Sequence, residues 1–379
     1  AHTAILARGL GLPAIVAAKG VTDIADGTVV YVDSNEGIVD TEPTDADREA
    51  AIKYANRKPV ADFDGKGVLA DGTRVELYAN VGDGKSAEKA ASLKAEGVGL
   101  LRTEFGFLGH DAEPSIETQA KTYKSVFDAF PGKHIVVRTL DAGADKPLPF
   151  LNVNPEENPA LGVRGFRTDW TVPGVLTRQL QAIKAASEDS DADIWVMAPM
   201  ISTTSEARNF ANMLKEIGLP VHGVMVETPA AVMNAEAILG EVDFVSIGTN
   251  DLTQYTMAAD RLLGDLAHLN NPWQPAVLKM IKMTVEGAQR ASVTAGKKKY
   301  VSVCGEAAAD PALAVVLIGL GVDTLSMNAG AIPAVAAVLK SVTKEKAQQI
   351  AAIALQQISS AEAKESARKA LPILDELGL

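Results

Sequence analysis

Two carboxylates stand at the ends of apolar runs that predict buried strands. Glu227 closes the run 221–227, and Asp251 follows the run 244–249. Charged groups in such places are costly unless they pair with something or bind something. Two carboxylates on neighbouring strand ends repel each other unless a cation lies between them, and oxygen-only ligands suit Mg²⁺ or Mn²⁺. Pairing of each carboxylate with an arginine is the alternative, but we predict that Glu227 and Asp251 are metal ligands.

Four arginines could surround a small anion. Arg102 and Arg138 lie at strand ends, whereas Arg164 and Arg261 lie in two long connections. A guanidinium group matches a phosphoryl group or a carboxylate with two parallel hydrogen bonds. Salt bridges to nearby carboxylates would explain any one of these arginines. All four together with a metal suit a substrate that carries both a phosphoryl group and a carboxylate.

Three further side chains carry weaker signals. Cys304 is the only thiol, and a lone cysteine on a strand is more often a buried small hydrophobe than a catalyst. Its place at a strand end, before Gly305 and Glu306, favours a role as proton donor or nucleophile. His2 lies beside the first residue and says little alone, and Lys146 could face a substrate or only the solvent.

The elements that would position these groups alternate between strands and helices. Amphipathic stretches at 86–96, 117–130, 205–217, 229–239, 275–295 and 311–320 predict helices. Eight runs predict strands, at 75–81, 98–104, 135–141, 194–200, 221–227, 244–249, 300–304 and 324–328. Eight such units favour a closed (β/α)8 barrel, whose active site gathers at the C-terminal ends of its strands. A doubly wound open sheet competes, but no Gly-rich dinucleotide fingerprint follows the first strand.

The chain divides into three parts by pattern. Residues 1–41 hold short apolar runs broken by turn residues and predict a fragment of a small β-rich domain. Residues 42–62 include a polar helix over 45–58 that ends before Pro59 and could act as a hinge. Residues 63–379 hold the barrel, with two long connections at 142–169 and 251–271 and a helical C-terminal region. Long connections in compact folds are usually functional.

Composition excludes several classes of protein. The 379 residues carry a formal net charge of −12, so a nucleic acid or an anionic membrane is not an expected partner. No apolar run reaches membrane-spanning length, and the single cysteine favours a reducing, cytoplasmic compartment. The chain begins Ala1-His2-Thr3 inside an apparently structured segment, so we expect further sequence upstream.

Taken together, the motifs resemble one family. They are Gly99–Phe105, Arg138–Asp141, Asn158–Arg164, Met225–Pro229, Ile247–Tyr255 and Cys304–Glu306. This set, in this order, resembles phosphoenolpyruvate–protein phosphotransferase, Enzyme I of the bacterial sugar phosphotransferase system. The segment from His2 to Arg8 is similar to the family's phosphohistidine segment, with Ala1 where Ser is common.

The resemblance implies a role for each candidate residue. His2 would attack the phosphorus of phosphoenolpyruvate, and Cys304 would protonate the departing enolate to give pyruvate. Glu227 and Asp251 would ligate Mg²⁺. The substrate-binding residues would be Arg102, Arg138, Arg261, Asn250, Asp251, Arg164 and Lys146. The family's carrier partner is HPr, which docks on an upstream helical domain that this chain lacks, and a homodimer formed through the barrel is also implied.

Three alternatives stay open at this stage. A phosphoenolpyruvate synthase or pyruvate phosphate dikinase shares the barrel and the histidine but needs a nucleotide domain. A Mg²⁺-dependent lyase acting through a pyruvate enolate would use the same carboxylates and would not need His2. A binding module that senses phosphoenolpyruvate without turnover is the third.

Overall fold

The computed structural model describes residues 14–15, 18, 20–33, 37–55, 60–142, 148–151 and 155–379. Two compact units divide the chain, residues 1–60 with 373–379 and residues 61–372. Two candidate site residues, His2 and Lys146, lie outside the described residues.

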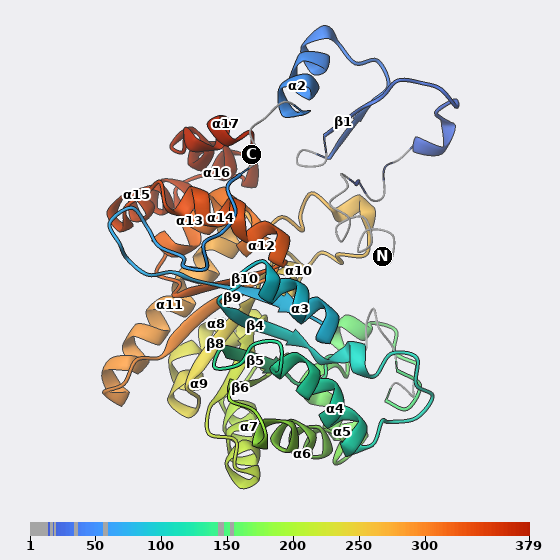
Figure 1. The fold of residues 1–379 in the computed structure, drawn as a ribbon, viewed down its shortest axis with the longest axis vertical. Coiled ribbons are helices and arrows are strands. Elements are labelled where there is room, and N and C mark those ends of the chain that lie inside the picture. Colours follow the sequence, from blue (N-terminus) through green and yellow to red (C-terminus); the bar gives the residue numbers. More distant parts are fainter. Residues whose placement is uncertain are drawn as a thin grey trace. The chain divides into compact units, whose positions relative to one another are not determined.

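The larger unit is a closed barrel of eight parallel strands, in the order β10-β3-β4-β5-β6-β7-β8-β9 (Figure 1). The predicted (β/α)8 barrel is therefore confirmed. The strands are β3 (Glu76–Val81), β4 (Gly97–Arg102), β5 (His134–Arg138), β6 (Asp193–Ala198), β7 (His222–Val226), β8 (Phe244–Gly248), β9 (Tyr300–Cys304) and β10 (Thr324–Met327). Each differs from its predicted range by three residues or fewer at either end.

Helices follow the strands and cover the barrel. They are α3 (Gly84–Ser92), α4 (Ile116–Phe127), α5 (Thr168–Thr171), α6 (Val175–Glu188), α7 (Thr204–Ile217), α8 (Pro229–Met233), α9 (Ala235–Glu241), α10 (Thr249–Met257), α11 (Pro275–Ala295), α12 (Glu306–Ala309), α13 (Pro311–Gly319) and α14 (Ile332–Leu339). Next come α15 (Lys344–Leu355), which packs on α13, and α16 (Ser360–Lys369), which packs on α15.

Short 3-10 helices complete the unit: η2 (Thr103–Gly106), η3 (Pro159–Leu161), η4 (Gly165–Arg167), η5 (Gly264–Leu266) and η6 (Ala329–Ala331).

Local sequence explains where several of these helices begin and end. Asp83 and Thr203 each accept a hydrogen bond from the third backbone N–H of α3 and α7, in reciprocal capping boxes. Gly218 ends α7 in the left-handed conformation that glycine adopts without strain. These signals fix the residues at which the helices begin and end.

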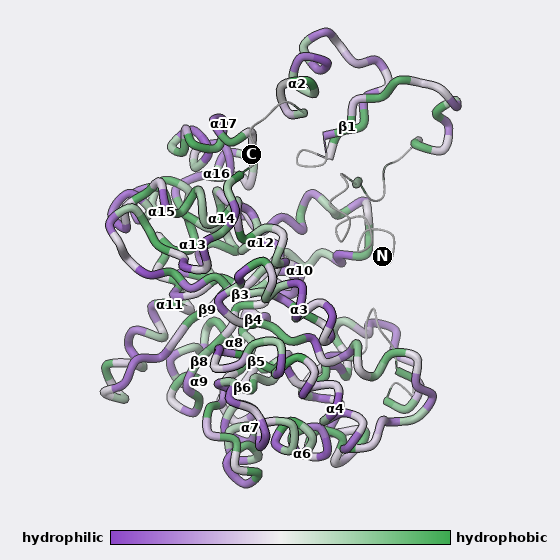
Figure 2. Tube along the Cα trace, in the orientation of Figure 1, coloured by the Kyte–Doolittle hydropathy of each residue, from purple (hydrophilic) through white to green (hydrophobic). Residues whose placement is uncertain are grey.

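The apolar side chains of the strands form the barrel core, and Figure 2 shows hydrophobic strands beside helices of mixed hydropathy. One interior cluster contains Leu100, Val136, Met197, Met225, Phe244 and Cys304. Cys304 is therefore part of a packed core as well as the last residue of β9.

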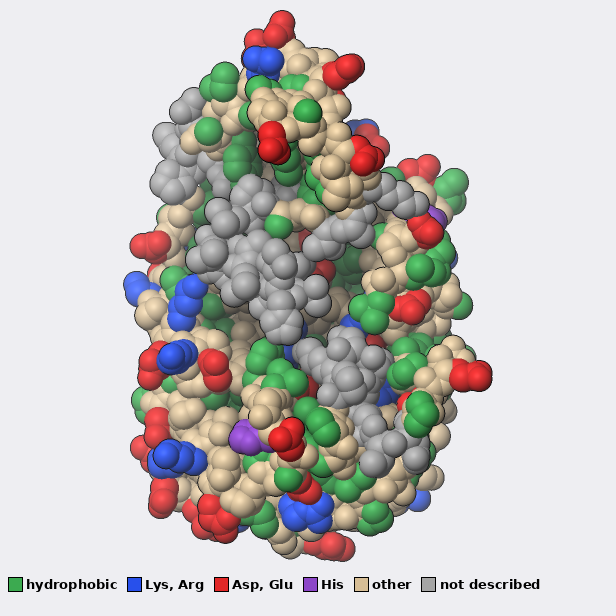
Figure 3. Space-filling model, turned by 90° about the vertical axis from the view of Figure 1, so that its right-hand side faces the viewer, with side chains coloured by type: hydrophobic (Ala, Val, Ile, Leu, Met, Phe, Trp, Pro, Cys, Tyr) green, Lys and Arg blue, Asp and Glu red, His purple; other side chains and the backbone are tan. Residues whose placement is uncertain are grey.

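The smaller unit contains η1 (Val21–Asp23), an antiparallel pair β1 (Tyr31–Asp33) and β2 (Ile38–Asp40), α2 (Asp45–Ala55) and α17 (Ile373–Leu377). No helix among the described residues is long and apolar enough to cross a bilayer. On the face drawn in Figure 3, Lys and Arg side chains are scattered among Asp and Glu.

The second long connection differs from the prediction. The segment 251–271 is not one loop, because α10 begins at Thr249, directly after β8. Asp251 thus lies in the first turn of a helix, where a carboxylate is favoured by the helix dipole.

Candidate functional site

The candidate residues meet at one mouth of the barrel. Arg102, Arg138 and Cys304 are the last residues of β4, β5 and β9. Glu227 follows β7, and Asp251 follows β8. Because all eight strands run parallel, their C-terminal ends open on the same side, the face where active sites of this fold lie.

Glu227 is fully enclosed, with 1% of its surface exposed. Its Oε1 accepts a hydrogen bond of 2.6 Å from the backbone N–H of Met200, which follows β6. Its Oε2 has no hydrogen-bond partner among the described residues. A Cβ added to Gly248 would lie 2.6 Å from this Oε2, so only glycine leaves room for the carboxylate. Burial, with the nearby charges of Asp251 and Asp141, raises the pKa of Glu227 to about 8.

Asp251 is held by two arginines from the long connections. Arg164 donates from Nη1 to Oδ1 at 2.8 Å, and Arg261 Nη1 lies 3.4 Å from Oδ2. Arg164 also donates to Tyr255 Oη at 3.3 Å, and that hydroxyl donates to the carbonyl of Ala160. Both long connections therefore converge on the second candidate metal ligand.

A second ion-pair group joins β4 and β5. Arg138 pairs with Glu104, and its Nη1 lies 3.4 Å from Asp141 Oδ2. Arg164 donates to both oxygens of Asp141, at 3.2 and 2.8 Å. Burial alone would raise the pKa of Asp141, but Arg138 and Arg164 outweigh it and hold the pKa below its usual range. The Asp141 carboxylate is thus a charged partner for Arg138 and Arg164.

Arg102 and Cys304 lie close to this group. Burial and the neighbouring Arg138 charge lower the pKa of the Arg102 guanidinium, and they outweigh Glu104 and Cys304, which act to raise it. Burial raises the pKa of the Cys304 thiol, whose Sγ donates to the carbonyl of Ile247 at 3.7 Å. The thiol is therefore protonated at neutral pH. A proton donor must carry this proton, whereas a nucleophile would act as the thiolate.

Asn250 lies on the same side of the mouth as the thiol. A Cβ built on Gly305, the residue after Cys304, would be 3.8 Å from Asn250 Oδ1. Gly305 has φ +113°, a conformation that side chains rarely adopt. A Cβ at this distance would make only ordinary van der Waals contact with Asn250, so it is the backbone conformation of the turn after β9 that calls for glycine.

The donor set fits a hard divalent cation that keeps part of its coordination for water or substrate. No group of three or more His, Cys, Asp or Glu side chains gathers as a metal cage within the described ranges. Two carboxylates remain, and Mg²⁺ is usually bound by one or two carboxylates plus substrate phosphate and water. The buried Glu227 Oε2 is an acceptor of the kind such an ion would use.

Both interpretations of the arginines have support in this geometry. Arg138 and Arg164 make the salt bridges to Glu104 and Asp141 that the sequence left open as an alternative. Arg138, Arg164 and Arg261 nevertheless all act on Asp141, and Arg102 lies beside Arg138 and Glu104 at the same barrel mouth. Structural pairing and anion binding are compatible, because a guanidinium group has five N–H donors.

Sequence reasoning did not single out Gln179 on α6. Gln179 is 1% exposed and lies on the same helix face as Leu176, Leu180 and Ile183. A polar residue on an apolar helical stripe was the available signal, since such a group must find hydrogen-bond partners when buried.

The fold and this mouth define a class of protein. Residues 60–344 match the family model described as PEP-utilising enzyme, PEP-binding domain, and residues 1–37 match PEP-utilising enzyme, mobile domain. The chain belongs to the family of PEP-utilising enzymes.

Within that family, curated relatives confirm the narrower resemblance. Phosphoenolpyruvate-protein phosphotransferase from Streptomyces coelicolor is 46% identical over 374 residues, covering 98% of this chain and 66% of that protein. The protein of the same name from Haloferax volcanii is 39% identical, with 96% of this chain and 65% of that protein covered. A multiphosphoryl transfer protein from Xanthomonas campestris is 39% identical, with 94% of this chain and 43% of that protein covered.

The chain thus spans just under two thirds of the length of its first two relatives. Among solved structures, a citrate lyase from Burkholderia xenovorans has a TM-score of 0.45 at 15% identity. That match covers 80% of this chain and 92% of that chain, and it adds nothing to the family assignment.

Proposed function

We propose that this chain binds phosphoenolpyruvate at the barrel mouth and transfers its phosphoryl group to His2, releasing pyruvate. The observation that carries the proposal is the convergence of Arg102, Arg138, Arg164 and Arg261 with Glu227 and Asp251 in a buried site of a chain whose net charge is −12. An anion can be held here only by local positive charge working against the overall field. The role of His2 rests on the resemblance and on the family match over residues 1–37.

The arginines would do most of the binding. Arg102, Arg138 and Arg261 would hold the phosphoryl group, and Asn250 and Arg261 would help near the carboxylate. Lys146, outside the described residues, would lie at the substrate as well. In phosphoryl transfer, positioning and charge neutralisation supply most of the rate, and buried donors act more strongly than donors in water.

Glu227 and Asp251 would hold Mg²⁺, with Mn²⁺ as a substitute, because hard oxygen ligands suit both ions. When bound, the ion would neutralise charge on the phosphoryl group and on the enolate. Arg164 and Arg261 would then share Asp251 with that ion.

Two side chains of this chain would carry out the transfer of the phosphoryl group and the protonation of the enolate. A nitrogen of His2 forms a bond to phosphorus as the bond from phosphorus to the enol oxygen breaks, and the electron pair stays on that oxygen. The Cys304 thiol then donates its proton to carbon 3 of the enolate, which gives pyruvate. A buried thiol with a raised pKa holds the proton that this step uses.

The test is labelling with phosphoenolpyruvate that carries a radioactive phosphoryl group, in the presence of Mg²⁺. We expect an acid-labile label on the wild-type chain and none on His2→Ala, whose barrel is unchanged and should still bind phosphoenolpyruvate in calorimetry. Cys304→Ser should bind as the wild type does but release pyruvate more slowly. Label that persists in His2→Ala, or wild-type chain that binds no phosphoenolpyruvate with Mg²⁺, would contradict the proposal.

Partners and location follow from the same proposal. The phosphoryl group would pass from His2 to the HPr carrier, which docks on a domain found upstream in the family, and the barrel would form a homodimer. Residues 1–41 would be the remainder of the phosphohistidine domain, 42–62 the hinge and 63–379 the barrel domain. The single cysteine supports a cytoplasmic location.

The family matches also fit a phosphoenolpyruvate synthase or pyruvate phosphate dikinase. The names of the relatives at 39–46% identity support phosphotransfer to protein instead.

A further inference from the structure

We propose that Gln179 is a positioning residue that holds the ends of β4 and β5 together, and with them Arg102 and Arg138. The inference deepens the proposed function, because it rests on these arginines binding an anion. Gln179 itself lies behind the strands, on α6, and does not reach the candidate metal ligands through any described contact.

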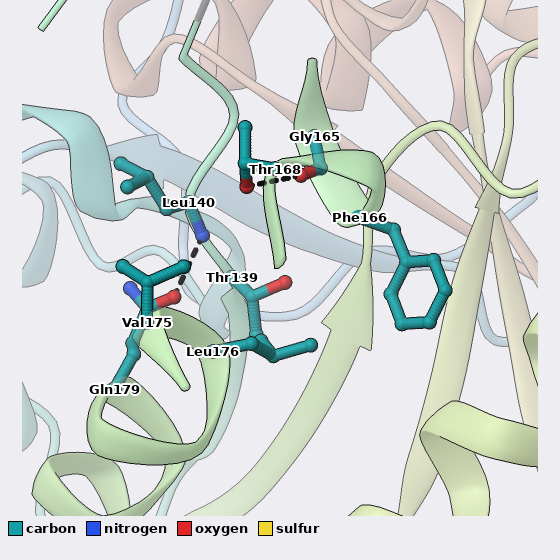
Figure 4. A pocket seen from close by; sticks show the side chains of 8 residues that line it. All are labelled: Thr139, Leu140, Gly165, Phe166, Thr168, Val175, Leu176 and Gln179. Carbon is teal, nitrogen blue, oxygen red and sulfur yellow. Dashed lines mark hydrogen bonds between the residues drawn. The ribbon is translucent and has the colours of Figure 1, made fainter. Parts of the chain in front are cut away.

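The side chain of Gln179 uses all its main hydrogen-bonding groups. Nε2 donates to Thr103 Oγ1 and to Tyr123 Oη, both at 3.0 Å. Oε1 accepts from the backbone N–H of Leu140 at 2.8 Å, a bond drawn in Figure 4. In that view Gln179 points from its helix toward Leu140, at the edge of a small hollow that Thr139 also lines.

Two of these partners lie next to, or within two residues of, arginines that would bind substrate. Thr103 separates Arg102 from Glu104, and Leu140 lies between Arg138 and Asp141 in the chain. Thr103 Oγ1 in turn donates to the carbonyl of Arg138 at 2.9 Å. The Gln179 amide therefore holds the backbone of Leu140, just after β5, and the side chain of Thr103, just after β4.

The network is anchored on a second helix. Tyr123 on α4 is 2% exposed and donates from Oη to Gln119 Oε1 at 3.1 Å. Gln119 Nε2 donates to the carbonyl of Pro114 at 2.9 Å. Since Tyr123 Oη both accepts from Gln179 and donates to Gln119, the bonds run in one direction and polarise one another. Such a satisfied buried network gives a rigid, unique arrangement.

Rigidity matters here because recognition by a guanidinium group depends on geometry. A phosphoryl group is bound bidentately only when the planar fork faces it, and a shift of about 1 Å in a positioning contact can cost ~100-fold in rate. Strand ends that slide past each other would separate Arg102 from Arg138. The amide of Gln179 opposes that sliding from outside the barrel.

Three variants test the inference by calorimetry with phosphoenolpyruvate and Mg²⁺. Gln179→Leu removes every hydrogen bond while keeping the volume similar, and we expect the Kd for phosphoenolpyruvate to rise about 10- to 100-fold. Tyr123→Phe keeps the bonds of Gln179 to Thr103 and Leu140, so it should bind within about threefold of the wild type. Both substitutions remove buried polar groups of the same network, which makes Tyr123→Phe the matched control.

Gln179→Glu adds a readout that a purely structural role would not give. A neutral glutamic acid has one O–H donor and one carbonyl acceptor and can mimic the amide, whereas the carboxylate only accepts. Because position 179 is buried, the pKa of a glutamic acid there should be raised, so the Kd of Gln179→Glu divided by that of the wild type at each pH should approach one at pH 5 and rise toward pH 8. Folded Gln179→Leu and Gln179→Glu with wild-type Kd at all pH values would overturn the inference.

Hydrogen exchange separates this inference from the proposed function. In Gln179→Leu the backbone N–H of Leu140 loses its acceptor, so its exchange and that of peptides spanning 101–104 should accelerate relative to Tyr123→Phe. If the wild-type chain binds no phosphoenolpyruvate, the proposed function fails, and exchange alone decides whether Gln179 holds the strand ends. Unchanged exchange in folded Gln179→Leu would refute it.

Discussion

At the scale of single residues, the site is a set of buried charges that already have partners. Glu104 is 2% exposed and pairs with Arg138, and Arg164 bridges Asp141 and Asp251. Removing one member of a buried pair costs more than the pair contributes, because the other charge remains without water. Glu227 differs, since one of its oxygens has no partner among the described residues. We infer that Glu227 is the group most sensitive to what binds in the mouth.

The raised pKa of Glu227 predicts how stability depends on pH. Its pKa is about 8 in the fold against an ordinary value of 4.5, so the folded chain holds this proton more tightly than the unfolded chain does. That contribution to the free energy of unfolding is complete below pH 4.5 and is lost as the pH rises to about 8, at up to ~1.4 kcal/mol per pH unit. Glu227→Gln lacks this contribution, because a glutamine side chain does not titrate. In urea unfolding with a metal chelator present, the wild type should therefore lose stability relative to Glu227→Gln between pH 5 and pH 8.

Glu241 provides the control for that measurement. A hydrogen bond from Arg208 lowers the pKa of Glu241, so its contribution has the opposite sign and is lost only as the pH falls toward its folded pKa. The difference in free energy of unfolding between Glu241→Gln and the wild type should thus stay constant between pH 5 and pH 8. A parallel pH dependence for the wild type and Glu227→Gln would show that the carboxyl of Glu227 is not held protonated by the fold.

At the scale of elements, the site depends on close contacts between strand ends and long connections. Met200, after β6, has φ +58°, although it is not glycine, and its N–H is the donor to Glu227. Gly165, in η4 beside Arg164, also has φ +58°. Phe166 N–H donates to the carbonyl of Pro199 at 3.3 Å, which ties η4 to the end of β6. The segment that carries Arg164 is therefore held against the residue that orients Glu227.

Gly165→Ala should disturb this contact. The added Cβ would lie 2.9 Å from Met200 Cβ and 3.3 Å from Pro199 Cγ, and both are buried positions with little freedom to move. The left-handed backbone costs an alanine about 1–2 kcal/mol, and overpacking adds a further ~1–3 kcal/mol. The free energy of unfolding from urea titration should fall by the sum of the two. Gly132→Ala is the matched control, because it has φ +67° and nothing within 4 Å of its added Cβ. Equal losses in the two variants would show that the Gly165 contact carries no energy beyond the backbone strain.

At the scale of the whole molecule, the sequence predicts the architecture better than it predicts which side chains pair. The eight strands were predicted because buried parallel strands are continuous apolar runs, and closure then brings their polar C-terminal residues to one mouth. That reasoning locates Glu227, Asp251, Arg102 and Arg138 without coordinates. It cannot tell that Arg164 bridges Asp141 and Asp251, because the spacing in the chain, 23 and 87 residues, carries no information on side-chain direction. The network of Gln179 was not predicted, because spacing in the chain does not show which buried groups its amide reaches.

The division into two units leads to a last prediction. Among the described residues, every hydrogen bond and ion pair of Glu227, Asp251, Arg138 and Arg164 joins residues within 61–372. Deletion of residues 1–60 therefore removes none of these contacts, and changes that share no partner are additive to within ~0.5 kcal/mol, about twofold in a binding constant. Chain 61–379 should bind phosphoenolpyruvate with Mg²⁺ within that factor of the full chain while taking no label, since His2 is gone. Because α17 is grouped with the deleted residues, chain 61–372 is the companion variant, and circular dichroism with thermal unfolding establishes that each is folded. A folded 61–379 that has lost its affinity would mean that the barrel mouth does not form the binding site by itself.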